Sequence, residues 1–353
     1  MNPPSPRSWT VVAAYFVGPD SRWLDDFIDD PSLVFRKQGP VRQAPAGARN
    51  WHARRTRFTS AGEWLGHLRQ ARAALADRPD GVIASFPQLA MCLALLKRLG
   101  RLKPRIIAYN YNLGGFPGGA KRRLARFVAA EIDVYVVHSP SEVGSYAEYL
   151  GVPRDRVRLI PLQRGRIRIP RIEETEAPFL LAMGSAHRDY ATLIAAVDAL
   201  AIPTLIVTRA ADAATLPASP HVEFRSGLTE GDCIALLARA RLSVTPISNL
   251  TTASGQVTFL DAMQMGVPVI ATNCPGTEGY IENGRTGLLV PPFDADALRT
   301  AIASLWDDAP RRAALSEAAR RESAARFSDE AAAAALAGLI DGLPPVPADA
   351  GRP

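Results

Sequence analysis

The stretch TASGQVTFLDAMQMGVPVIAT, residues 252–272, decides the fold class of this chain. Ser254 is a preferred helix N-cap, and Gly266 followed by Pro268 is a typical helix end. These signals predict a helix over residues 255–265, followed at once by an apolar strand. A short buried strand directly after a helix is typical of parallel α/β sheets covered on both faces.

Asp261 interrupts the apolar character of that helix. Phe259 and Leu260 belong to one apolar side, whereas Asp261 lines up with Thr258 and Ser254 on the other side. Uncompensated burial of a charge is costly, so this carboxylate needs a partner. Two kinds of partner are open: an arginine or backbone amide elsewhere in the chain, or a bound ligand.

The start of the same helix suits a phosphate. Free backbone amides and the positive end of the helix dipole favour an anion there, which predicts an anion site at Ser254, Gly255 and Gln256. Asp261, two turns further on, is placed to accept hydrogen bonds from ribose hydroxyls, with Thr258 beside it. Together these residues predict a site for a nucleoside diphosphate.

A second glycine-containing loop, GSAHR at residues 184–188, follows a predicted strand and opens a helix. Gly184 permits close approach of the backbone to a ligand, with Ser185 next to it. Arg188 can neutralise a diphosphate through two parallel hydrogen bonds. The alternative is an ordinary turn with a solvated arginine.

Strands and helices alternate in two blocks along the chain. Expected strands of the first block cover residues 9–17, 81–86, 104–110, 133–139 and 156–162. The segment 163–178, rich in charge and proline, separates this block from the second. We therefore expect an N-terminal domain over 1–165, a linker over 166–177, a C-terminal domain over 178–326, a last helix over 327–343 that can return to the N-terminal domain, and a disordered tail over 344–353.

Composition narrows the class of protein. The chain has 353 residues, 47% hydrophobic and 22% charged, which is typical of a globular protein. It has neither an apolar run of the roughly 20 residues that cross a bilayer nor a secretory signal, so we expect a cytoplasmic protein, acting in solution or at the inner face of the membrane. The net charge of +6 fits a phosphorylated ligand, an anionic membrane or mere composition. Nucleic acid is not expected, because no RNA-binding aromatic motif or zinc finger is present.

Three segments resemble the family-4 (group 1) retaining glycosyltransferases of the GT-B fold. The segment SGQVTFLDAMQMGVPVIATNCPGTEGYIENGRTGLLVPPFDADAL, residues 254–298, is similar to the family's donor-binding signature. The other two are MGSAHRDYATLIAA, residues 183–196, and DVYVVHSPSEVGSYAEYLGVPRDRVRLIPL, residues 133–162. The resemblance implies an α/β protein with two Rossmann-like domains whose parallel sheets face each other across a cleft. It also implies front-face transfer of a sugar with retention.

The chain departs from the family pattern at several positions of the expected donor site. The family carries two glutamates separated by seven residues, and this chain has Ala253 and Asp261 there. A further family carboxylate falls at Gly279. The family's arginine in the first loop is replaced at Ser185, whereas Arg188 matches its lysine. Because these positions lie where the family binds the donor sugar, the departures leave open which sugar is bound and, to a lesser degree, whether the protein is active.

Candidates for the acceptor side lie at strand ends of the first half. His138 ends a predicted strand, and Asn110 and Asn112 end another, where imidazole and amide groups suit catalysis and the binding of sugar hydroxyls. A glycine-rich loop, expected to be mobile, follows these asparagines. The alternative for Asn110 and Asn112 is turn formation together with the glycines.

Two further patterns have structural explanations. Asp294 and Asp296 have the spacing of a metal-binding DxD motif. They follow Pro291-Pro292-Phe293 at the start of a predicted helix, so we expect them to cap that helix and to bind no metal. A predicted amphipathic helix carries a basic face formed by Lys121, Arg122, Arg123 and Arg126. Such a face is either solvated or a peripheral membrane contact.

The sequence therefore predicts a glycosyltransferase that needs no metal or other cofactor. It would move a sugar from a nucleoside-diphosphate donor to an acceptor hydroxyl of a carbohydrate or lipid-linked molecule, in the synthesis of bacterial surface polysaccharide, glycolipid or glycoconjugate. The alternatives are a sugar-nucleotide-binding pseudoenzyme, a GT-B sugar-nucleotide epimerase, and a basic nucleic-acid-binding protein.

Overall fold

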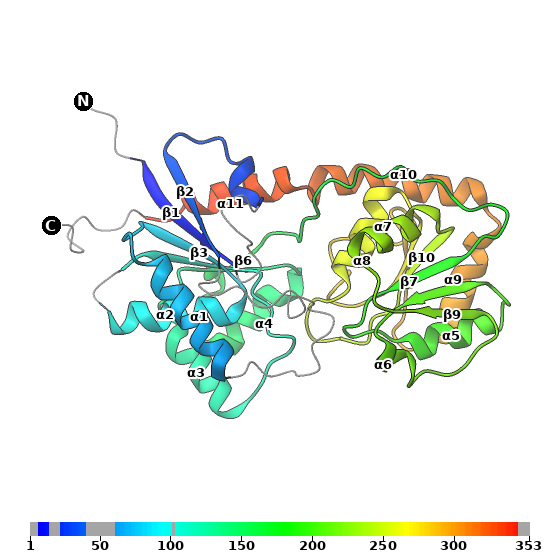
Figure 1. The fold of residues 1–353 in the computed structure, drawn as a ribbon, viewed down its shortest axis with the longest axis horizontal. Helices are drawn as coiled ribbons and strands as arrows, with labels where there is room; N and C mark the ends of the chain where they lie inside the picture. Colours follow the sequence, from blue (N-terminus) through cyan, green and yellow to red (C-terminus); the bar gives the residue numbers. More distant parts are fainter. Residues whose placement is uncertain (1–5, 14–21, 40–60, 101–102, 345–353) are drawn as a thin grey trace. The chain divides into compact units, whose positions relative to one another are not determined.

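The structure is a computed structural model that describes residues 6–13, 22–39, 61–100 and 103–344. The predicted tail over 344–353 lies outside these residues except for Pro344. The chain divides into two compact units (Figure 1). Unit 1 comprises Met1–Ile160 and Ala332–Pro353, and unit 2 comprises Pro161–Ala331.

Unit 1 is built on a six-stranded parallel sheet in the order β2-β1-β3-β4-β5-β6. Its strands are β1 (Arg7–Val12), β2 (Leu33–Gln38), β3 (Gly81–Ser85), β4 (Arg105–Tyr109), β5 (Val134–Val137) and β6 (Val157–Leu159). Its helices are η1 (Leu24–Phe27), α1 (Ala61–Ala74), α2 (Pro87–Leu99), α3 (Gly119–Ala129), α4 (Pro140–Leu150) and η4 (Arg154–Arg156). The short central strands are almost fully apolar, as expected of parallel strands buried on both faces.

The last helix, α11 (Asp329–Asp341), completes unit 1 (Figure 1). Its buried residues, among them Ala333, Leu336 and Ile340, pack into a core that also holds Trp9 of β1. Helices α1 to α4 share the other main core of the unit. Each face of the sheet is therefore covered, one of them by a segment distant in sequence.

Unit 2 repeats the architecture with the order β12-β11-β10-β7-β8-β9, again all parallel. Its strands are β7 (Leu180–Met183), β8 (Thr204–Val207), β9 (Val222–Arg225), β10 (Leu242–Thr245), β11 (Val269–Thr272) and β12 (Leu288–Val290). Its helices are α5 (Tyr190–Asp198), α6 (Ala210–Ala213), α7 (Glu230–Arg239), α8 (Gln256–Met265), α9 (Ala295–Trp306) and α10 (Ala309–Arg326). Two apolar cores flank the sheet.

The alternation expected from the sequence is present in both units, and two local expectations need correction. Helix α8 begins at Gln256, and its N-cap is Gly255 in the left-handed conformation at φ 86°, so Ser254 is not the cap. Strand β2 was not predicted, because its partly exposed residues lack the continuous apolar run of the central strands.

The segment expected as a linker is held firmly on unit 2. It has no regular secondary structure, yet the amide of Ile172 donates to Ala238 O at 3.0 Å and that of Glu174 to Arg239 O at 2.9 Å. The Arg171 guanidinium donates to Gly266 O at 2.5 Å. No helix among the described residues is long and apolar enough to cross a membrane.

Candidate functional site

The sheet of unit 2 has a switch point between β7 and β10. From β7 the chain continues outward to β8 and β9, and β10 is followed on the opposite side by β11 and β12. Loops diverge at the carboxyl ends of such neighbouring strands and leave a crevice that commonly binds ligands. Here the loop after β7 and the loop after β10 are joined by hydrogen bonds. Ser248 N donates to His187 O at 3.0 Å, and Asp189 N donates to Pro246 O at 3.1 Å.

Arg188 lies at this switch point and is half-buried. Its guanidinium donates to Met183 O at 3.1 Å, to Ala186 O at 2.7 Å and to Thr258 Oγ1 of α8 at 3.1 Å. Gly184, at φ 117°, leaves room for it, because a Cβ there would lie 2.5 Å from Arg188 Nη2. The two predicted donor-site segments are thus brought together by one side chain.

The charge of Arg188 has no acidic partner among the described residues. Its hydrogen-bond acceptors are two carbonyls and a hydroxyl, all neutral. Burial lowers the pKa of Arg188, although an arginine stays protonated in proteins. A half-buried cation with only neutral partners favours an anionic ligand.

The N-terminus of α8 adjoins this cation. The amides of Thr258 and Phe259 both donate to Gly255 O, so the amides that precede them in the chain have no carbonyl one turn back in the helix. Ser254 Oγ is buried and has no hydrogen-bond partner among the described residues. The loop after β11 approaches closely, since a Cβ on Gly276 would lie 2.1 Å from Ser254 O. An orphaned hydroxyl and a helix N-terminus beside a cation fit a phosphate group.

Two other predicted donor residues have their side chains engaged within unit 2. Gln256 Nε2 donates to Tyr280 Oη at 3.3 Å, and the same oxygen accepts from Leu162 N at 2.7 Å. Ser185 Oγ lies 3.5 Å from Thr208 Oγ1. Any part that Gln256 plays in anion binding therefore falls to its backbone amide.

Asp261 is paired within the protein. Its Oδ1 accepts from Arg164 Nε at 2.7 Å and its Oδ2 from Arg164 Nη2 at 3.2 Å, while Glu230 Oε1 accepts from the same Nη2 at 2.9 Å. Of the two partners that the sequence left open, an internal arginine is the one observed. A carboxylate offers about four acceptor positions, so two remain for hydroxyls.

Burial acts against both charges of this pair. Burial raises the pKa of Asp261 and the Arg164 guanidinium opposes that shift. Burial also disfavours the charged guanidinium, but the carboxylates of Asp261 and Glu230 outweigh it, and the pKa of Arg164 is raised above its usual value. Each partner is thus the main stabiliser of the other's charge.

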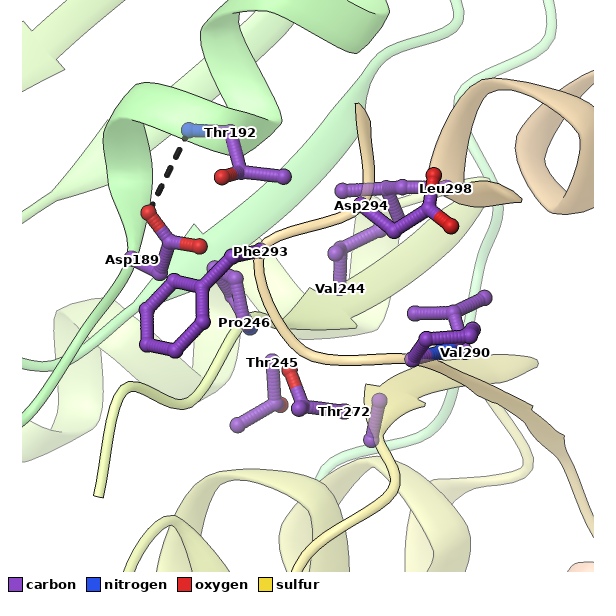
Figure 2. Close-up of a pocket in the computed structure, with 12 residues that line it drawn as sticks. Asp189, Thr192, Val244, Thr245, Pro246, Thr272, Val290, Phe293, Asp294 and Leu298 are labelled. Carbon is purple, nitrogen blue, oxygen red and sulfur yellow. Dashed lines mark hydrogen bonds between the residues drawn. The ribbon is translucent and has the colours of Figure 1, made fainter. Parts of the chain in front are cut away.

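A small cavity of unit 2 lies at the carboxyl ends of β10 and β11, between the starts of α5 and α9 (Figure 2). Asp189, Phe293 and Asp294 line it with Thr245 and Thr272, and the Asp189 carboxylate accepts from Thr192 N at 3.3 Å. Its volume of 10 Å³ is about the room of one water molecule. This cavity cannot receive a nucleotide.

Asp294 caps α9, as expected, by accepting from Ala297 N at 2.8 Å. The DxD resemblance is therefore a helix start. No group of three or more His, Cys, Asp or Glu side chains among the described residues is arranged to hold a metal ion.

In unit 1 the structure brings Asn110 and His138 together at the carboxyl ends of β4 and β5. His138 Nε2 contacts Asn110 Oδ1, its Nδ1 lies 2.7 Å from Ile160 O, and Asn110 Nδ2 lies 3.1 Å from Ser85 Oγ. Burial lowers the pKa of His138 to about 4, against the effect of its bond to Ile160. This shift favours the neutral imidazole at physiological pH.

Asn112 serves a turn, because its Oδ1 accepts from Gly114 N at 2.7 Å. The glycine-rich loop after it is anchored to α4. Leu113 N donates to Tyr146 Oη at 2.8 Å, and Phe116 packs against Tyr146 with ring centroids 5.1 Å apart. This part of the loop, expected to be mobile, is held by aromatic packing.

The basic face of α3 is partly structural. Arg122 and Arg126 both donate to Tyr149 O in the last turn of α4, where cations satisfy free carbonyls and oppose the helix dipole. The remaining outward face exposes Leu124 and Phe127, each 49% accessible. The arginines of α3 are therefore not all solvated, and its outward face carries apolar side chains as well as basic ones.

Comparison with known proteins places both units in one family. The family pattern described as Glycosyl transferases group 1 matches residues 209–322, and that described as Glycosyl transferase 4-like domain matches residues 12–163. The chain belongs to the group 1, family-4 glycosyltransferases. Its two sheets of six parallel strands with flanking helices fit the two Rossmann-like domains of the GT-B fold.

Solved structures support the fold over almost the whole chain. Sucrose-phosphate synthase from Thermosynechococcus elongatus has a TM-score of 0.72 at 17% identity, covering 95% of this chain and 98% of that one. The Anabaena protein HepE in complex with UDP and glucose has a TM-score of 0.66 at 13% identity, covering 95% and 99%.

Curated relatives match over shorter segments. A GDP-mannose-dependent alpha-(1-6)-phosphatidylinositol monomannoside mannosyltransferase from Mycolicibacterium smegmatis is 30% identical over 134 residues, 37% of this chain and 35% of the relative. Alpha-D-kanosaminyltransferase from Streptomyces kanamyceticus is 36% identical over 83 residues, 24% and 22% of the two chains. The alignments thus span between about a fifth and a third of these relatives.

Sequence reasoning missed Arg164 and Ser85. Arg164 stands in a charged segment whose other arginines are mostly exposed, so nothing local distinguishes it. Ser85 ends a buried strand next to Phe86-Pro87, and only this position, at a strand's carboxyl end, could have drawn attention to it.

Proposed function

We propose that this protein transfers a sugar, with retention, from a nucleoside-diphosphate donor to an acceptor hydroxyl. The observation that carries the proposal is Arg188, a half-buried cation with neutral partners beside the N-terminus of α8 and the orphaned Ser254 Oγ. An anionic diphosphate supplies the missing counter-charge.

In this proposal unit 2 holds the donor and stabilises the leaving group. As the glycosidic bond breaks, negative charge develops on the diphosphate, and the Arg188 guanidinium with the α8 amides attracts it more strongly than in the ground state. That is the role a divalent metal fills in other enzymes, so we propose that no metal is required. Asp261 accepts a ribose hydroxyl with the lone pairs that Arg164 leaves unused.

Incubation with sugar nucleotides tests the proposal and separates its rivals. GDP-mannose and UDP-glucose come first, because a relative uses GDP-mannose and the HepE structure holds UDP and glucose. Transfer or slow hydrolysis supports a transferase. Binding without turnover indicates the pseudoenzyme, which Ala253 in place of a carboxylate would suit, and conversion to another sugar nucleotide indicates an epimerase. Absence of all binding refutes the donor site.

We also propose a lipid-linked acceptor met at the inner, cytoplasmic face of the membrane, in the synthesis of bacterial surface glycans. Leu124 and Phe127 are exposed on α3 beside Lys121 and Arg123, a combination that suits an anionic bilayer surface. A carbohydrate acceptor in solution is the alternative. Nucleic acid is not proposed as a partner.

A further inference from the structure

A polar cluster of unit 1 lies at the carboxyl ends of three adjacent strands. Ser85 ends β3, Asn110 follows β4 and His138 follows β5. Ser85 is 1% exposed and His138 6% exposed, and Asn110 is half-buried. Two residues here have a positive φ, Phe86 at 82° and Asn110 at 55°. Asparagine adopts this left-handed region more readily than other residues, but a bulky phenylalanine there is strained, which is a common feature of functional sites.

The contacts of the His138 ring limit where its proton can be. Nδ1 lies 2.7 Å from Ile160 O, which can only accept, so Nδ1 must carry the proton. In a neutral ring Nε2 is then an acceptor, and it cannot face an amide oxygen. A contact between Nε2 and Asn110 Oδ1 would require a second proton on the ring.

The surroundings of His138 do not support a charged ring. The ring is buried, and the edge of the Tyr109 ring packs on it with centroids 5.8 Å apart. Glu142 of α4 is the buried acid nearby, but its Oε2 accepts from the backbone amide of His138 at 3.3 Å. Burial of the ring disfavours an imidazolium.

Exchanging the oxygen and nitrogen of the Asn110 amide resolves all three contacts. The two ends of a carboxamide have nearly the same shape, so the hydrogen-bond network decides which end is the oxygen. With the exchange, the Asn110 NH₂ donates to His138 Nε2, Ser85 Oγ donates to the Asn110 carbonyl, and His138 Nδ1–H donates to Ile160 O. In none of these three contacts does an acceptor then face an acceptor.

We infer that His138 is a positioning residue, which with Ser85 fixes the Asn110 carboxamide for binding a ligand hydroxyl. The exchanged amide keeps one N–H and one carbonyl lone pair beyond the contacts it makes with described residues. A hydroxyl both donates and accepts, so it can use both positions. That this hydroxyl belongs to the sugar acceptor rests on the proposed function, whereas the protonation state does not.

Nitrogen-15 NMR of the imidazole in the full chain tests the protonation state without any ligand. His138→Gln identifies the signal among the five histidines, and His221→Gln serves as a matched control in unit 2. We expect a neutral ring protonated on Nδ1 at pH 7. Asn110→Asp should convert the ring to an imidazolium at that pH, because a carboxylate then faces Nε2. An Nε2-protonated or charged ring in the unmodified protein overturns the inference.

A pair of variants of similar length and shape tests the positioning role. His138→Gln keeps an acceptor near the place of Nε2, and His138→Met fills similar space without one. With the donor and acceptor found in the sugar-nucleotide screen, His138→Met should raise the acceptor KM about tenfold, the size of one neutral hydrogen bond, and His138→Gln distinctly less. The donor KM should stay unchanged in both. Equal acceptor KM values for the two variants contradict positioning, and absence of turnover in the unmodified protein contradicts only the proposed function.

Discussion

Replacing Arg164 by methionine leaves the Asp261 carboxylate buried without its counter-ion. The Asp261 side chain is 7% exposed and that of Arg164 is 25% exposed. Breaking a fully buried pair costs about 3–5 kcal/mol, and the solvent access of Arg164 reduces this to about 2–3 kcal/mol. In a unit of this size that corresponds to a fall in Tm of about 4–12 °C.

The same charge predicts a specific pH dependence. Burial already raises the pKa of Asp261, and loss of Arg164 raises it further. A group with a raised pKa in the folded state binds a proton more tightly there than in the unfolded chain, so stability falls as pH rises through the folded pKa. The deficit of Arg164→Met should therefore be largest at neutral pH and should shrink as the solution is acidified towards pH 4.

Urea unfolding of the apo protein measures both effects. Asp261→Asn is the companion variant, and we expect a smaller loss of about 1–2 kcal/mol, because Arg164 keeps Glu230 and partial solvent access. The double variant should be less than additive, since either change alone removes the pair. An Arg164→Met protein as stable as the unmodified one at pH 7 would refute the assignment of a stabilising pair. Melts with UDP and GDP then show whether Asp261→Asn also loses nucleotide stabilisation.

Four other outcomes are expected. Arg188→Ala should weaken nucleoside-diphosphate binding by about 1.5–3 kcal/mol in calorimetry, with unchanged affinity counting against the donor site. Activity should survive EDTA, and loss restored by Mg²⁺ or Mn²⁺ would contradict a metal-free mechanism. Folding lowers the pKa of His138 from 6.5 to about 4, so the neutral ring contributes about 3 kcal/mol to the free energy of unfolding above pH 6.5. This contribution is lost as the pH falls towards 4. His138→Gln should therefore flatten the dependence of stability on pH between these two values. Leu124→Asp with Phe127→Asp should reduce sedimentation with anionic phosphatidylglycerol vesicles severalfold, and equal sedimentation of both proteins would exclude α3 as the contact.

The order of strands and helices in the described residues follows largely from the sequence. Apolar runs the length of a strand, glycine at helix ends and the alternation of the two element types are local properties. The helix and strand predicted within residues 252–272 match α8 and β11 almost residue for residue. The weaker predictions concern segments with little periodicity. Strand β2 and the attachment of residues 163–178 to unit 2 depend on neighbours that the local sequence does not name.

The sequence by itself determined the α/β class, the family resemblance and the loops of unit 2 where a diphosphate site was expected. Tertiary structure decided what each charged or polar side chain contacts. Asp261 meets Arg164, 97 residues away, and His138 meets Asn110 and, through it, Ser85. Helix α11 returns to unit 1 after the whole of unit 2. Periodicity reports which face of an element is buried, but the partner across that face is set by the order of strands in the sheet, and that order brings together residues far apart in the chain.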